Sequence, residues 1–187
     1  MKTREGRDTV QLKKIKEEKQ IPLEYRDTPI GELIRYQNLM GDFKTYDSAQ
    51  LLVGMCMDNR KQLRIPENFA YIIRTGGANL RYSEFKVSYA IAIGNVGHIA
   101  IIAHDNCGMV NLVSKREQFI EGLSKNAGWE RQRAEEHFMN YAPMFEIDNE
   151  LDFVAREAKR LEEKYPGVMV APLLYTIDDN MLSIITE

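Results

Sequence analysis

IAIIAHDNCG, residues 99–108, joins an unbroken apolar run to a polar segment that contains a histidine and a cysteine. A short apolar run without alternation is typical of a strand that is buried on both faces of a sheet. Similar runs occur at residues 51–55 and 71–73. Residues 83–93, which lie between the runs at 71–73 and 99–103, favour a helix. Fully apolar strands separated by helices indicate a parallel sheet with both faces covered. The sequence therefore predicts an α/β fold.

The second half of the chain continues the same pattern. Helices are expected within residues 109–141 and over 149–164, where the latter has one apolar stripe. Strands are expected over residues 168–176 and, after a turn, at the edge over 182–185. We therefore predict a central, mostly parallel β-sheet of four to five strands flanked by helices.

The first part of the chain predicts an N-terminal helical arm. It is highly charged at its start, and Thr28 followed by Pro29 is a typical helix beginning. No composition shift or linker divides the rest. We expect one domain over residues 1–187, with the helical arm at 1–41 and the α/β core at 42–187.

Bulk composition excludes several classes of protein. The chain has 187 residues, of which 44% are hydrophobic and 28% charged, and its net charge is −3. These values are ordinary for a globular protein and give no sign of a nucleic-acid partner. The sequence shows neither a secretion signal nor an apolar stretch long enough to span a bilayer. We expect a cytoplasmic protein that contacts no membrane.

Polar clusters follow three of the predicted strands. They cover residues 56–60, 74–79 and 104–108. Ligands of open parallel sheets bind beyond the carboxyl ends of the strands. The three clusters therefore predict a site for a small-molecule substrate at that edge.

The first and third clusters contain the donors of a metal site, Cys56, His104 and Cys107. Two thiolates and one imidazole suit zinc. The sequence has no third cysteine, and the two other histidines, His98 and His137, lie in segments predicted to be a strand start and a charged helix. Catalytic zinc sites have three protein ligands and an open position, whereas structural sites have four. The count therefore predicts a zinc site with one open position.

Asp58 and Arg60 are the candidate catalytic residues. In an extended segment they lie on the same side as Cys56. Asp58 can accept a hydrogen bond from metal-bound water, or take the open position itself, while Arg60 holds the carboxylate in a bidentate geometry. The alternative is an ordinary surface ion pair, which would contribute little.

These residues resemble the motifs of the β-class carbonic anhydrases, in the short bacterial and archaeal form. The pattern Cys-x-Asp-x-Arg matches at residues 56–60, and His-x-x-Cys-Gly matches at 104–108. The turn between them matches only at Arg74 and Gly77. The resemblance implies a homodimer, or a higher multiple of dimers, with Zn²⁺ on the three donors named above.

The resemblance also implies an activity. Zinc-bound hydroxide would hydrate carbon dioxide reversibly to bicarbonate, with Asp58 and Arg60 as the catalytic pair. In part of the family the aspartate instead moves onto zinc and closes the site.

Three other functions stay open at this point. Relatives with the same zinc core hydrolyse carbonyl sulfide or carbon disulfide, and others could be catalytically silent zinc proteins. A redox role, with Cys56 and Cys107 pairing reversibly, is the remaining alternative.

Overall fold

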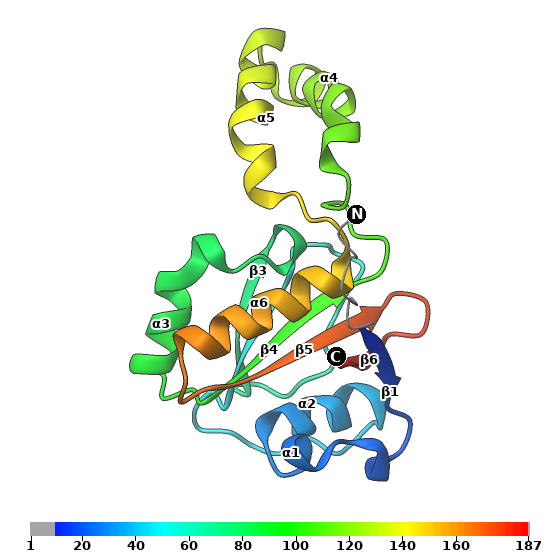
Figure 1. Cartoon of the computed structure of the whole chain (residues 1–187), viewed down its shortest axis with the longest axis vertical. Helices are drawn as coiled ribbons and strands as arrows, with labels where there is room; N and C mark the ends of the chain where they lie inside the picture. Colours follow the sequence, from blue (N-terminus) through cyan, green and yellow to red (C-terminus); the bar gives the residue numbers. More distant parts are fainter. Residues whose placement is uncertain (1–9, 187) are drawn as a thin grey trace, which may run out of the picture.

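The computed structural model describes residues 10–186, which form one six-stranded sheet with helices on both faces (Figure 1). The strand order is β1-β6-β5-β4-β2-β3. β2, β3, β4 and β5 pair in parallel, whereas β6 is antiparallel to both β5 and β1. The strands are β1 (Gln11–Lys14), β2 (Leu51–Cys56), β3 (Ala70–Thr75), β4 (His98–His104), β5 (Met169–Thr176) and β6 (Met181–Thr186). The predicted mostly parallel sheet is confirmed.

The sheet has one strand more than predicted, and that strand comes from the expected helical arm. Gln11–Lys14 pairs antiparallel with the edge strand β6. All four of its side chains are exposed. Exposed lysines on a short strand are typical of a sheet edge, where they discourage pairing with further chains. This segment forms a strand because it pairs with the edge of β6. The charge pattern of the segment itself could not predict that pairing. Residues 1–9 of the arm lie outside the described residues.

The predicted helices are present, with small changes at their ends. The hydroxyl of Thr28 accepts a hydrogen bond from the amide of Ile30, and Pro29 begins α2 as expected. The helices are α1 (Leu23–Arg26), α2 (Pro29–Asn38), α3 (Glu84–Ala92), α4 (Arg116–Ala127), α5 (Arg131–Phe145) and α6 (Glu150–Lys164). The 3-10 turns are η1 (Glu18–Gln20), η2 (Gly76–Ala78), η3 (Arg81–Ser83) and η4 (Leu112–Lys115). None of the helices within residues 10–186 combines the length and the apolar character needed to cross a membrane.

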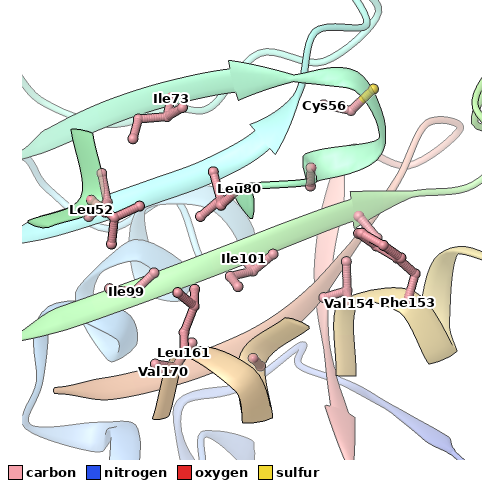
Figure 2. Packing of buried hydrophobic residues seen from close by; sticks show 14 of the residues in the cluster. Leu52, Cys56, Ile73, Leu80, Ile99, Ile101, Phe153, Val154, Leu161 and Val170 are labelled. Atoms are coloured by element: carbon pink, nitrogen blue, oxygen red, sulfur yellow. The ribbon is translucent and has the colours of Figure 1, made fainter. Parts of the chain in front are cut away.

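Two apolar layers cover the two faces of the sheet. On one face, α3 and α6 pack against alternate residues of β2 and β4, such as Leu52, Ile99 and Ile101 (Figure 2). On the other face, α2 packs against the intervening residues, such as Val53 and Ala100. Both sets are buried, which explains why these strands are apolar throughout.

Gly54 of β2 is required by close packing. A Cβ atom at this position would lie 2.7 Å from Cδ1 of Leu80, which covers the strand. Leu80 belongs to the segment that connects β3 to α3 and is itself fully buried. The glycine thus lets this segment lie directly on the sheet, next to the strand ends that carry the polar clusters.

The helical hairpin α4–α5 stands apart from the two layers. It projects beyond the carboxyl ends of the parallel strands, at the top of Figure 1. Its own interior is small and contains Ile120, Ala134 and Phe138. The chain then returns through α6 to the sheet, so the hairpin is an insertion between the metal-ligand turn and the second half of the fold.

Candidate metal centre

The structure brings Cys56, His104 and Cys107 together at the carboxyl edge of the sheet. Cys56 ends β2, His104 ends the neighbouring strand β4, and Cys107 lies in the turn after β4. Their donor atoms all lie within 4.8 Å of one another, and the two sulfur atoms are 3.9 Å apart. All three residues are buried. Parallel pairing of β2 with β4 thus gathers donors that are far apart in the sequence.

His104 is oriented to present one nitrogen to the two sulfurs. Its Nδ1 lies 2.8 Å from the carbonyl oxygen of Asp105, to which it donates a hydrogen bond. Its Nε2 is buried and has no hydrogen-bond partner among the described residues. A buried nitrogen without a partner is costly unless a ligand satisfies it. The donor set, two thiols and an imidazole with its free nitrogen directed inward, fits a zinc ion.

The two thiols differ in their protonation. The hydrogen bond from Cys107 is the main cause that lowers the pKa of Cys56, and the neighbouring imidazole of His104 and the charge of Lys61 act in the same direction. The same contact and burial raise the pKa of Cys107. A metal ion binds thiolates, so its binding would displace the protons that the two sulfurs carry.

Asp58 and Arg60 form the expected ion pair, but through a turn rather than an extended segment. β2 ends at Cys56, and the Asp58 carboxylate then accepts a hydrogen bond from the backbone amide of Arg60 at 2.9 Å. The guanidinium donates to both carboxylate oxygens, with Nε at 3.0 Å from Oδ1 and Nη2 at 2.7 Å from Oδ2. These hydrogen bonds hold the pKa of Asp58 well below its usual range. The carboxylate is ionised at neutral pH.

Asp58 faces the three donors without joining them. Its Oδ2 lies 3.8 Å from Nε2 of His104. Within residues 10–186, the group of mutually close metal donors consists of the two cysteines and the histidine. Arg60 also donates to the carbonyl oxygen of Asn106 at 3.1 Å, which ties the pair to the turn that carries Cys107. The fixed carboxylate therefore lies beside the three donors without being one of them.

Two basic residues support the turn after Cys56; the sequence placed Arg74 in one of the polar clusters without this role, and it did not identify Lys61. Arg74 at the end of β3 donates to the carbonyl oxygens of Cys56, Asp58 and Lys61, at 3.2 to 3.4 Å. Lys61 donates from Nζ to the Cys56 carbonyl at 3.1 Å and is only 1% exposed. Burial lowers the pKa of Lys61 to about 8. A lysine next to a polar turn reads as a surface residue, so no sequence signal could have revealed its burial.

The first turn of α6 supports the ligand turn. The Glu150 carboxylate accepts a hydrogen bond from the backbone amide of Cys107 at 3.0 Å. Lys115 donates to the carbonyl of Gly108, and Asp105 accepts from the amide of Ile177 at 2.8 Å. The helical hairpin separates Glu150 from Cys107 in sequence, so this contact too depends on the tertiary structure.

An apolar cavity of about 290 Å³ lies between the hairpin α4–α5 and the strand ends. One wall contains Met57 and Met109, which are one and two residues from the ligand cysteines, and Gly76. The other wall contains His137, whose ring lies 4.7 Å from that of Tyr141. His137 therefore belongs to an aromatic cluster and, like His98, is not among the grouped metal donors.

Solved structures share this fold. The β-carbonic anhydrase isoform I of Trichomonas vaginalis is 17% identical, with 79% of this chain and 90% of that chain covered and a TM-score of 0.61. A carbonic anhydrase from Glaciozyma antarctica is 15% identical, with 87% of this chain and 98% of that chain covered and a TM-score of 0.59. The apo form of a carbon disulfide hydrolase is 16% identical, with 85% of this chain and 89% of that chain covered and a TM-score of 0.51. Neither a family model nor a curated protein sequence matches the chain. The chain has the β-carbonic anhydrase fold.

Proposed function

We propose that this protein is a zinc enzyme that reversibly hydrates carbon dioxide to bicarbonate. The observation that carries the proposal is the buried group of Cys56, His104 and Cys107 with the Asp58–Arg60 ion pair directly beside it. Three donors and an open position are typical of catalytic zinc rather than structural zinc. When bound there, zinc would lower the pKa of a water molecule toward neutrality and so supply a nucleophile at physiological pH.

The residues around the donors would orient that water. Asp58, ionised and fixed by Arg60, would accept a hydrogen bond and keep the reactive lone pair directed at the substrate. Two thiolates would neutralise the charge of the metal ion, so a neutral substrate meets no strong field. Neither role needs a movement of the side chains as they stand.

Two features of the site argue against two of the alternatives. A zinc ion with a purely structural role needs no carboxylate beside an open position. A redox pair would need both sulfurs free, whereas the unpartnered Nε2 of His104 is directed at them. One tightly bound zinc per chain, measured on the purified protein, would exclude the redox pair.

Hydrolysis of carbonyl sulfide or carbon disulfide is the second candidate. The apolar cavity beside Met57 and Met109 favours it, because a sulfur analogue is larger and more hydrophobic than carbon dioxide. Both reactions would use the same donors and the same carboxylate. Only a direct comparison of substrates distinguishes them.

We also propose a homodimer. The outer strand β3 has an unpaired edge, and Ile72 on it and Phe85 and Tyr89 on α3 are exposed. An edge strand with exposed apolar side chains invites pairing with another copy. Light scattering on the purified protein would measure the mass in solution, and a monomer at micromolar concentration would refute this part.

Stopped-flow hydration of carbon dioxide between pH 7 and 9, on protein of known zinc content, tests the activity. Asp58→Ala should keep its zinc and lose about 10²- to 10⁴-fold in turnover, the usual contribution of a positioned acid or base. Asp178→Ala, at an exposed carboxylate in the β5–β6 turn, is the matched control and should match the parent protein. Full activity in Asp58→Ala would rule out the proposed role of the pair. Inactivity of the zinc-loaded parent protein, with turnover of carbonyl sulfide, would select the second candidate.

A further inference from the structure

The site contains a buried cation whose charge no carboxylate neutralises. The Lys61 side chain is 1% exposed, and its Nζ donates to the carbonyl oxygen of Cys56. No aspartate or glutamate within residues 10–186 forms an ion pair with it. A buried ammonium without a partner is strongly disfavoured. Burial of the charged ammonium group therefore costs little free energy only if the surrounding site supplies negative charge.

The main negative groups near Lys61 belong to the metal centre. They are Cys56, Asp58 and Cys107, whereas the like charge of Arg74 opposes them. Asp58 is already paired with Arg60, whose side chain is 46% exposed. Lys61 is thus the one fully buried positive charge beside the two sulfurs in the described structure.

The interaction of Lys61 with the centre depends on the net charge of the centre once a metal ion is bound. A divalent metal and two thiolates sum to zero, so the centre with a neutral ligand gives Lys61 little to interact with. An anion in the open position makes the centre negative by one unit in a buried place. We propose that Lys61 is the buried counter-charge that stabilises an anion at the open coordination position of the metal centre.

This inference rests on the proposed zinc site but not on the proposed substrate. It makes Lys61 a positioning residue for anions, which include bicarbonate and hydroxide as well as simple inorganic ions. It also separates Lys61 from Arg60, which is exposed and engaged with Asp58. Solvent screens an exposed charge, whereas a buried one keeps its effect at physiological salt.

Anion affinity measured at one fixed pH tests the inference without any turnover. The protein is loaded with one cobalt ion per chain, and azide is titrated while the visible spectrum of the cobalt–thiolate centre is recorded. Lys61→Met removes the charge and keeps the length of the side chain. The azide dissociation constant should rise by about ten- to thirtyfold, as expected for one unit charge acting over roughly 8–12 Å at an effective dielectric constant of ~20.

Lys125→Met is the control. Lys125 is an exposed lysine on α4, outside the residues that support the metal centre. Its removal should change the azide dissociation constant by less than about threefold, because solvent screens the exposed ammonium. An equal effect of both substitutions would overturn the proposal, since it would show a general surface attraction.

Two further outcomes would also overturn the proposal. One is an azide affinity in Lys61→Met within about twofold of the parent protein. The other is loss of cobalt from both Lys61→Met and Lys61→Gln, which would assign the lysine to holding the fold of the site. Lys61→Gln keeps a donor for the Cys56 carbonyl, so it covers the case in which Lys61→Met does not fold. Absence of carbon dioxide hydration alone would leave the azide result intact and would refute only the proposed substrate.

Discussion

Replacement of Glu150 by alanine should loosen the turn that carries Cys107. The Glu150 carboxylate accepts the backbone amide of Cys107 at 3.0 Å, from the first residue of α6. α6 is fixed at this end by Asn149, whose side chain accepts from the amide of Asp152 at 2.9 Å. The position of the acceptor is therefore set by the helix and not by the ligand turn.

The size of the effect follows from the kind of hydrogen bond. A bond to a charged group contributes about 1.5–3 kcal/mol. In a domain of this length each kcal/mol corresponds to roughly 2–4 °C in Tm, so a loss of ~2 kcal/mol in Glu150→Ala should lower the Tm of the metal-free protein by about 4–8 °C. If the turn must then be ordered on metal binding, a loss of about 2 kcal/mol weakens zinc affinity by roughly thirtyfold, at 1.36 kcal/mol for each factor of ten.

Calorimetry of the metal-free protein and competition with a zinc chelator would measure both effects. Glu150→Gln keeps a neutral acceptor and should lose about half as much, because charged hydrogen bonds are roughly twice as strong as neutral ones. Glu163→Ala, an exposed position on the same helix, is the control and should change neither quantity. The reasoning is refuted if Glu150→Ala binds zinc as tightly as the parent protein, or if Glu150→Gln is as damaged as Glu150→Ala.

Three further predictions concern the metal, the core and pH. Cys107→Ser should leave less than about 0.1 zinc per chain by elemental analysis, because a serine hydroxyl stays protonated where a thiolate must bind; one zinc per chain would remove Cys107 from the ligand set. Leu161→Ala, in the fully buried stripe of α6, should lower the free energy of unfolding in urea by about 2–5 kcal/mol, and a loss below 1 kcal/mol would contradict its place in the core. Burial raises the pKa of Tyr25 to about 12, so the stability that its proton contributes is complete below pH 10 and is lost as the pH rises toward 12. Unfolding at pH 9 and pH 11 should show this extra loss in the parent protein and not in Tyr25→Phe, and equal losses in both would refute it.

Much of the fold follows from local patterns. The apolar runs at residues 51–55 and 99–103 predict buried strands, because only strands covered on both faces need no polar alternation. Thr28 and Pro29 predict the beginning of α2 from backbone hydrogen bonding alone. The segment at Gln11–Lys14 differs, since its strand exists only because β6 offers an unpaired edge. A local pattern cannot show a partner that lies at the other end of the chain.

The same division holds at the candidate site. The chemistry of the donors determined from the sequence alone that Cys56, His104 and Cys107 suit one zinc ion, and the short spacing from Asp58 to Arg60 determined that these two side chains can pair. Only the tertiary structure decided the support around them: Lys61 buried behind Cys56, Arg74 across the strand end, and Glu150 beyond the helical hairpin. The physical reason is that a donor atom is a property of a residue type, whereas burial and the contacts of a long charged side chain depend on which distant segments surround it.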